Sequence, residues 1–181
     1  MGARMFEAVG RALRRRNAKQ RTRRLGWTAI YVGDYETCPT WAYTIGFHTS
    51  LGAPEIVVFD VPITTANGLF HAIYDDLKTG KLSIRDGEPW RPDEVDNPLV
   101  WRQVHSSRLY DNDPENPWLA LAEDHATILA PERGPISAFQ LVLTDAGGHL
   151  PWDPQYDETL RPRQRELYLP VPQTGADTAP C

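Results

Sequence analysis

The chain has 181 residues, of which 41% are hydrophobic and 24% are charged, and its formal net charge is −5 at pH 7. This length fits one domain, and the composition excludes a disordered chain. The only cysteines are Cys38 and Cys181, so we expect no disulfide framework and a soluble protein in the reducing cytoplasm. No apolar run reaches the roughly 18 residues of a membrane span.

Charge is divided unevenly along the chain. Residues 1–24 carry a net charge of +8, and the remainder carries −13. The apolar residues of the first segment recur at the spacing of one helix face, namely Met5, Phe6, Val9 and Leu13. We therefore expect a basic amphipathic N-terminal arm over 1–24, a globular domain over 25–169 and a flexible tail over 170–181. The alternative for the arm is a solvated, poorly ordered leader.

The domain begins with three segments of strand character. "WTAIYVGD" (27–34) is rich in β-formers and ends in a turn, and "WAYTIGF" (41–47) is the second strand. "PEIVVFDVP" (54–62) is an apolar run between prolines, which is typical of a central strand. The six-residue connector 48–53 is too short for a crossover helix and predicts an antiparallel pair.

Two helices follow, separated by a strand. Residues 63–80 carry an apolar helical stripe, with Thr64 or Thr65 as the expected cap and Gly80 as the end. Residues 83–98 are expected to be a loop, and "LVWRQVH" (99–105) is a strand. "NPWLALAEDHATIL" (116–129) predicts the second helix, with Asn116 as cap and Ile128 facing inward.

The last element before the tail is "ISAFQLVLTD" (136–145), a strand that leads into the turn "AGGH". The resulting order is β-β-β-α-β-α-β. It predicts a single α+β domain with a mainly antiparallel or mixed β-sheet and two main helices packed on one side of it. A doubly wound nucleotide-binding fold is not expected, because the early strands have no crossover helices between them.

Four sequence pieces carry a resemblance to a known family. They are "LGWTAIYV", "PTWAYTIGF", "APEIVVFDVP" and "FQLVLTDAGGHLPWDPQYD". In this order they resemble domain-of-unknown-function family 4262, a group of mostly bacterial proteins, over residues 25 to 157. The resemblance implies a shared fold and no settled activity. The chain departs from the family pattern at Ala53, where a histidine is common, and at His149, where an arginine is common.

The second of these pieces suggests a site through its alternation. On a strand, Trp41, Tyr43, Ile45 and Phe47 share one face, which is suited to a core, and the small or polar residues Ala42, Thr44, Gly46 and His48 share the other. Glu55 starts the next strand, and the Pro-Trp-Asp motif places an aromatic plate beside a carboxylate. A small-molecule pocket at the strand ends would gather Tyr43, Thr44, Gly46, His48, Glu55, Trp152 and Asp153.

A structural interpretation of the same residues stays open. Gly46 would then accommodate a packed helix, His48 would lie in an exposed loop and Glu55 would be a charge at a strand edge. Trp152 would cap the end of the sheet by packing. In this interpretation residues 39–48 are a core strand with one polar edge and not a catalytic motif.

Signatures of known chemistry are missing from the sequence. There is no Gly-x-Ser-x-Gly elbow, phosphate loop or dinucleotide fingerprint, and no metal motif beyond the helical pair His71 and Asp75. Cys38 has no evident group to activate it as a nucleophile. No reaction, cofactor or metal is therefore assigned, and whether the chain is an enzyme stays open.

Two functions remain compatible with the sequence. One is a binding or enzymatic domain for a small molecule. The other is a non-catalytic interaction protein that binds a partner protein and is tethered to an anionic surface by residues 1–24. Direct binding of nucleic acid is disfavoured, because the net charge of −13 on the rest of the chain repels phosphate.

Overall fold

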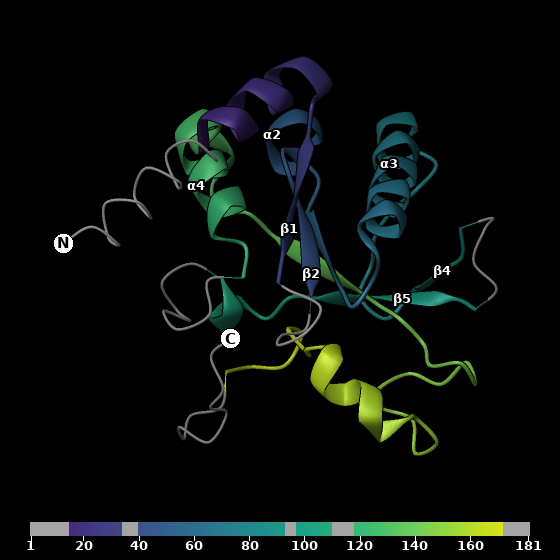
Figure 1. Cartoon of the computed structure of the whole chain (residues 1–181). Coiled ribbons are helices and arrows are strands. Elements are labelled where there is room, and N and C mark those ends of the chain that lie inside the picture. Colours follow the sequence, from purple (N-terminus) through teal and green to yellow (C-terminus); the bar gives the residue numbers. More distant parts are fainter. Residues whose placement is uncertain (1–14, 34–39, 93–96, 110–117, 172–181) are drawn as a thin grey trace.

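The computed structural model describes residues 15–33, 40–92, 97–109 and 118–171 (Figure 1). Within these ranges, six strands form one sheet in the order β1-β2-β3-β6-β5-β4. Their bounds are β1 (Thr28–Val32), β2 (Trp41–Ile45), β3 (Glu55–Phe59), β4 (Pro89–Trp90), β5 (Leu99–Gln103) and β6 (Ala138–Val142). β3 and β6 are parallel, and the other neighbours are antiparallel. The sheet is therefore mixed, which confirms the α+β class.

Helices cover both faces of this sheet. Besides a helix over residues 15–25, they are α2 (Phe47–Leu51), α3 (Ile63–Thr79) and α4 (Ala120–Leu129), with short 3-10 segments η1 (Ser106–Arg108), η3 (Pro131–Arg133) and η4 (Glu158–Arg163). Figure 1 shows α3 on one side of the strands, with α4 and helix 15–25 on the other. The expectation that the helices lie on one side is therefore wrong.

The reason lies in the central strand. Ile56 and Val58 of β3 pack with α3, and Val57 and Phe59 pack with α4, so both faces of β3 are apolar and buried. A strand with apolar residues on both faces needs a covering layer on each face. The apolar run 54–62 predicted a central strand. The sequence pattern did not show which helices would cover each of its two faces.

The second strand is shorter than expected. β2 ends at Ile45. Gly46 follows with a φ of 112° and is the N-cap residue of α2. Phe47 therefore packs in the core beside α3 and does not share a face with Tyr43. The predicted alternation fails from Gly46 onward, since a backbone with positive φ turns the chain out of the strand. The connector still joins two antiparallel strands, as expected.

The ends of the two main helices differ from the expectation in detail. Pro62 precedes α3 and no side chain caps it, so neither Thr64 nor Thr65 is the cap, while Gly80 ends the helix as expected. α4 begins at Ala120 with Leu119 at its N-cap position, so the helix starts later than expected, and the expected cap Asn116 lies outside the described residues. Ile128 is 62% exposed, so its expected inward position is wrong.

The last ten residues of the expected arm, 15–24, are helical and pack on the domain. Residues 15–25 are helical, Ala18 and Thr22 are buried, and Arg15 pairs with Asp124 of α4. The expected boundary after residue 24 thus falls within a helix that packs on the domain. The apolar face predicted from Met5 to Leu13 lies outside the described residues, as does the tail beyond Val171.

Candidate functional site

Glu55 is a buried acidic residue that links the sequence pieces carrying the family resemblance. This first residue of β3 is 1% exposed. Its Oε1 accepts hydrogen bonds from the backbone N–H of Gly46 at 2.9 Å and of His48 at 3.1 Å, and its Oε2 accepts one from Thr44 Oγ1 at 2.6 Å. Backbone N–H groups at a helix start lack partners within the helix, so the carboxylate satisfies the start of α2. Glu55 therefore joins β2, α2 and β3.

This carboxyl group is sealed from solvent. Burial raises the pKa of Glu55, and the hydrogen bonds from Thr44 and from the backbone of α2 offset part of that effect. Thr44 is fully buried, and its Oγ1 also accepts a hydrogen bond from Ile56 N at 2.9 Å. The side-chain oxygen atoms of Thr44 and Glu55 are thus hydrogen-bonded within the protein. Glu55 is a buried acceptor and not the expected charge at a strand edge.

Gly46 allows a second backbone segment to approach. A Cβ at Gly46 would lie 2.6 Å from Gly26 O and 3.0 Å from Trp27 Cα. A Cβ at Gly26 would in turn lie 2.0 Å from the hydroxyl oxygen of Tyr74 on α3. Two glycines thus let the Gly26–Trp27 turn fit between the end of β2 and α3. The signature glycine serves packing and fixes the position of Trp27.

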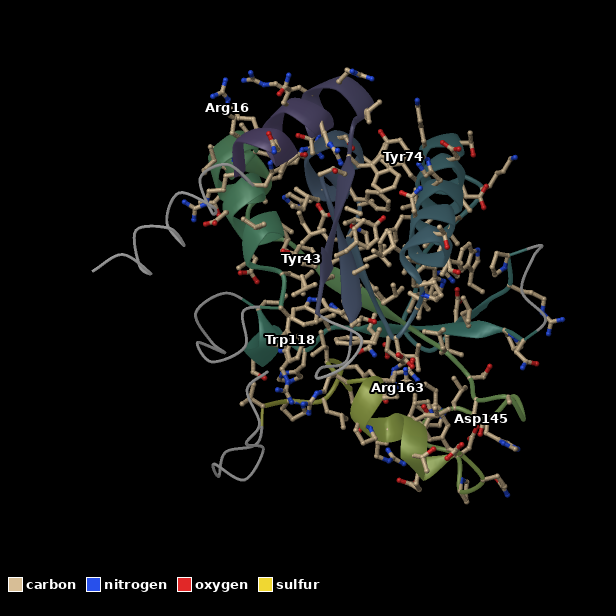
Figure 2. All side chains as sticks on the ribbon, in the orientation of Figure 1. Arg16, Tyr43, Tyr74, Trp118, Asp145 and Arg163 are labelled. Carbon is tan, nitrogen blue, oxygen red and sulfur yellow. The ribbon has the colours of Figure 1, made fainter. Side chains whose placement is uncertain are left out.

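Trp27 and Tyr74 form the buried floor of a cleft between helix 15–25, β1 and α3. This Trp27 cleft has a volume of about 360 Å³. Trp27 is 6% exposed and Tyr74 is 9% exposed, and Tyr74 projects from α3 toward β1 (Figure 2). The remaining lining residues are Arg21, Leu25, Thr28, Ala29, Tyr31, Asn67, His71, Asp75 and Lys78.

Aromatic rings dominate the floor of the cleft. The Trp27 ring lies 4.8 Å from the His71 ring at 74°, and 5.8 Å from the Tyr74 ring at 33°. Phe47 and Phe70 support Trp27 by edge contacts. This arrangement fixes the indole plane, because the rings around it pack edge-on or tilted.

The rim of the cleft is polar and carries more positive than negative charge. Tyr31 donates a hydrogen bond to Asn67 Oδ1 at 3.3 Å, and burial raises the pKa of Tyr31. Arg21 and Lys78 are cations, whereas Asp75 is the one acid in the lining, and within the described ranges none of the three forms an ion pair. An anion is therefore the ligand type that this rim favours.

The described residues of the Trp27 cleft supply too few potential ligands for a metal ion. His71 and Asp75 both line the cleft, as their spacing on α3 suggested. Over residues 15–33, 40–92, 97–109 and 118–171, no group of three or more His, Cys, Asp or Glu side chains is arranged to hold a metal ion.

The structure divides the seven predicted site residues between different places. Thr44, Gly46, His48 and Glu55 lie together around α2, and all four are buried. Tyr43 belongs instead to the core on the α4 side. The chain around residues 150–163 lies at the end of the sheet opposite α2 (Figure 1). The seven residues do not line one pocket, and a ligand role for any of them stays a prediction.

His48 differs from both expectations for it. It lies in α2, neither on a strand nor in an exposed loop, and it is 7% exposed. Its pKa is lowered by burial first and by nearby Arg133 second. Its Nε2 has no hydrogen-bond partner among the residues that the structure describes. His48 lines neither the Trp27 cleft nor a second cavity, between helix 15–25 and α4, and a ligand role for it stays a prediction.

Trp152 and Asp153 hold the C-terminal segment. Trp152 is 44% exposed, its ring packs edge-on against Tyr168, and the Arg102 guanidinium lies 5.0 Å from it and 4.4 Å from Tyr168. Asp153 Oδ2 accepts a hydrogen bond from Leu150 N at 2.7 Å. The motif thus packs around an arginine and caps its own turn.

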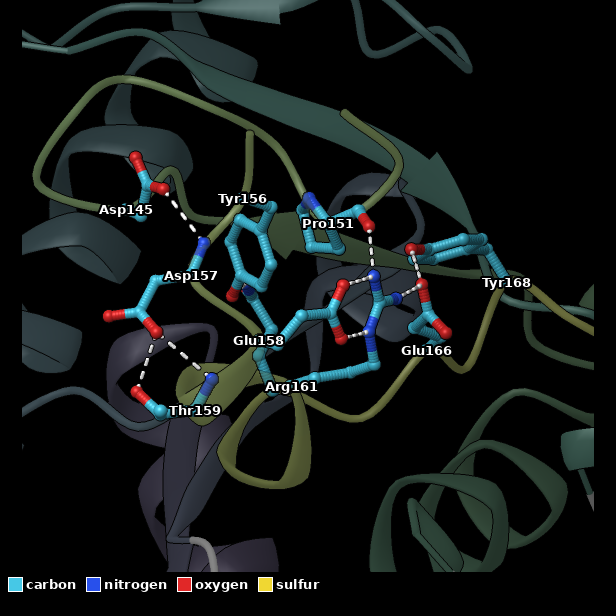
Figure 3. Close-up of polar contacts among 10 residues, drawn as sticks. Asp145, Pro151, Tyr156, Asp157, Glu158, Thr159, Arg161, Glu166 and Tyr168 are labelled. Carbon is cyan, nitrogen blue, oxygen red and sulfur yellow. Dashed lines mark hydrogen bonds and ion pairs between the residues drawn. The ribbon is translucent and has the colours of Figure 1, made fainter. Parts of the chain in front are cut away.

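The polar groups beside this motif are paired with one another (Figure 3). Arg161 binds Glu158 through two hydrogen bonds of 2.7 and 2.8 Å and also donates to Pro151 O at 2.8 Å. Tyr168 donates to Glu166 at 2.7 Å, and burial together with this hydrogen bond raises the pKa of Tyr168. These pairs hold η4 to Pro151 and to Glu166, so that Arg161 is engaged within the protein.

The cleft residues were not identified from the sequence. A signal was present on the helix over 63–79, where Asn67, His71, Tyr74 and Lys78 recur at spacings of three or four. This polar and aromatic stripe runs beside the apolar one. The Gly-Trp pair at 26–27 belongs to a sequence piece that carries the family resemblance. Nothing in the sequence showed that Trp27 faces the stripe on α3.

Comparisons with known proteins give one match. No curated protein and no solved structure matches the chain. In the part of the chain that the structure describes, every helix is too short or too polar to cross a membrane. The model of the family described as Domain of unknown function (DUF4262) matches residues 21–157, a range that includes the Glu55 cluster and the Trp27 cleft. The chain therefore belongs to the DUF4262 family.

Proposed function

We propose that this protein binds a small, ring-bearing anion in the Trp27 cleft. The observation that carries the proposal is a cleft of about 360 Å³ with an aromatic floor and two cations on its rim. Ligand pockets typically measure roughly 300–1,000 Å³ and combine apolar walls with a few polar groups. The volume is at the small end of this range, which favours a ligand of one or two rings.

The two ends of such a ligand meet different chemistry. The ring packs against Trp27 and Tyr74, whose planes are held by the aromatic side chains behind them. The anionic group lies toward Arg21 of helix 15–25 and Lys78 of α3, which approach from different elements. Charge-assisted hydrogen bonds to these cations are stronger than neutral ones, so they select an anion over its neutral analogue.

The signature residues act beneath the ligand in this proposal. Glu55 and Thr44 hold α2, and Gly46 holds the turn that carries Trp27. The strand-end residues would then shape the cleft without touching its contents. This role explains why a segment with a glycine, a threonine and an acid at fixed positions is buried.

We assign binding and no reaction. All lining residues of the cleft lie within the described ranges. Among these described residues, one hydrogen bond joins two side chains, those of Tyr31 and Asn67. A nucleophile in hydrogen-bond reach of an oriented base, the usual sign of covalent catalysis, does not occur among these lining residues.

Calorimetric titration with indole-3-acetate and its neutral amide tests the proposal. We expect the carboxylate to bind at least about 10-fold more tightly than the amide, since a hydrogen bond to a charged group contributes about 1.5–3 kcal/mol. Arg21→Gln combined with Lys78→Gln should remove this preference, whereas Arg23→Gln, an exposed change on the same helix, should keep it. Equal affinities of the intact protein for the two compounds would contradict the proposal.

A second candidate function is a tether to an anionic surface. The observation in its favour is that Arg16, Arg23 and Arg24 are exposed on helix 15–25. Sedimentation with vesicles containing phosphatidylglycerol tests it, and binding should fall as salt is raised. Replacing Arg23 and Arg24 by glutamate should abolish sedimentation. If that variant sediments like the intact protein, the described part of the helix is not the tether.

A further inference from the structure

A second cavity, of about 220 Å³, lies between helix 15–25 and α4. It shares no lining residue with the Trp27 cleft. Its walls include Leu121, Ile128 and Leu129 of α4, and its lining also includes Arg16 and Lys19. Neither the Glu55 cluster nor the proposed ligand of the Trp27 cleft accounts for it.

The wall of this cavity is apolar at a place where α4 meets solvent. Ile128 is 62% exposed, although a large apolar side chain on a helix normally faces a core. Ala18, by contrast, is buried under the cavity as part of the core on the α4 side. An apolar ligand group seated here would cover Ile128 and bury apolar area that water now contacts.

The lining of this cavity carries a net positive charge, because Arg16 and Lys19 remain after the ion pair between Arg15 and Asp124 is set aside. Asp124 is bound by Arg15, whose Nε lies 2.9 Å from the Asp124 carboxylate. The side chains of Arg16 and Lys19 form no ion pair or hydrogen bond with any part of the chain the structure describes. Two cations therefore border an apolar space, which is the arrangement that accepts an amphiphilic anion.

His125 adds a polar group to the lining. The residue is 7% exposed, and its Nε2 has no hydrogen-bond partner among the described residues. A buried polar atom without a partner costs about 1–3 kcal/mol, so such atoms are rare in folded proteins. Burial, with Lys19 as the second cause, lowers the pKa of His125, so the ring is neutral at pH 7 and one of its two nitrogens carries a proton.

From these contacts we infer that the cavity between helix 15–25 and α4 is a second binding site, specific for a small aliphatic carboxylate. The aliphatic part packs against Leu121, Ile128 and Leu129, and the carboxylate lies toward Arg16 and Lys19. His125 donates from Nε2–H to the carboxylate of the ligand. The site is independent of the proposed function, since the two cavities have separate linings.

Titration with sodium octanoate, with 1-octanol as the uncharged control, tests this inference. The readout is the ring signals of the five histidines in a proton–nitrogen NMR spectrum. Octanoate should shift the His125 signals in a saturable way and bind about 10-fold or more tightly than octanol, the factor that about 1.4 kcal/mol of charge pairing gives. Absence of a saturable His125 shift, or equal affinity for octanol, would overturn the inference.

Variants at the exposed wall separate charge from shape. Ile128→Glu places a like charge against the ligand and should remove octanoate binding, whereas Ile128→Gln should weaken it only several-fold. Both variants should fold, because Ile128 is largely exposed, and both should bind the probe of the Trp27 cleft like the intact protein. Equal octanoate affinities for the two variants would show that charge does not select the ligand, which would also overturn the inference.

Discussion

Thr44 Oγ1 lies 2.6 Å from Glu55 Oε2 and 2.9 Å from Ile56 N, so one buried hydroxyl both donates to the carboxylate and accepts from the backbone of β3. Glu55 in turn accepts from the first N–H groups of α2. The threonine and the glutamate are thus the link between two antiparallel strands and a helix start. The burial of Thr44 and Glu55 is understandable as this link.

Replacing Thr44 by valine should destabilise the protein. The variant keeps the shape of the side chain but removes a donor from the Glu55 carboxylate and an acceptor from Ile56 N. We expect the free energy of unfolding to fall by about 1–3 kcal/mol, the usual cost of leaving a buried polar group unsatisfied. Urea denaturation measures it. Thr44→Ser keeps the hydroxyl and loses one methyl group, so it should cost less; the reverse order would contradict this role for the hydroxyl.

The pH dependence of Glu55→Gln should reveal the buried carboxyl group. Burial raises the pKa of Glu55 in the folded state above its unfolded value. The carboxyl group therefore contributes stability that is fully present below the unfolded pKa of about 4.3 and is lost as the pH rises through the folded pKa. Glu55→Gln should therefore gain stability relative to the intact protein as the pH rises above the unfolded value of about 4.3.

Urea denaturation of both proteins at pH values above and below this one makes the comparison. A difference that stays constant with pH, or that turns in favour of the intact protein at high pH, would show that the hydrogen bonds outweigh the cost of burial. Lys81→Gln, which removes an exposed charge after the end of α3, serves as the control for general charge effects.

Gly46 and Gly68 should respond oppositely to alanine. Gly46 has a φ of 112° and no room for a Cβ beside Gly26 O, so Gly46→Ala should cost about 2 kcal/mol or more. Gly68 lies inside α3 with open space around it, and Gly68→Ala should stabilise the protein by about 0.5–1 kcal/mol. Thermal denaturation of both variants gives the two signs directly. A tolerated Gly46→Ala would mean that the turn at Trp27 is not held in this way.

Gln140 should anchor the C-terminal segment to the sheet. It is fully buried in β6, its Nε2 donates to Arg165 O, and its Oε1 accepts from Leu167 N at 2.9 Å. Gln140→Leu removes both bonds and should lower the free energy of unfolding by about 2–4 kcal/mol. Gln103→Leu, at an exposed position of β5, should change it by no more than about 0.5 kcal/mol. Comparable losses in the two variants would contradict the anchor.

Much of the fold was predictable because the strands and α3 carry strong local patterns. The apolar run 54–62 and the stripe on 63–79 predicted β3 and α3 to within about two residues at most ends. The placement of helices on both faces was not predictable, because it depends on which residues of separate elements meet. The two-residue strand β4 and the 3-10 turn η4 have no periodicity that a sequence pattern could reveal.

The site was less predictable than the fold. Alternation placed Thr44, Gly46 and His48 on one face of a strand, but the chain leaves the strand at Gly46, and no pattern showed that the Gly26–Trp27 turn packs on this glycine. The lining of the Trp27 cleft comes from three elements, and the residues on α3 are far along the chain from those on helix 15–25. A single sequence shows which residues share one helix face, but not which other element faces them.

The six tryptophan indole N–H signals provide the most direct test of the Trp27 cleft. They would be followed in a proton–nitrogen NMR spectrum during titration with indole-3-acetate, after assignment by single substitutions. Our account predicts a saturable shift of the Trp27 signal, while the signal of Trp152 at the other end of the sheet stays in place. A shift of Trp152 with Trp27 unchanged, or no saturable shift of any indole, would contradict the account.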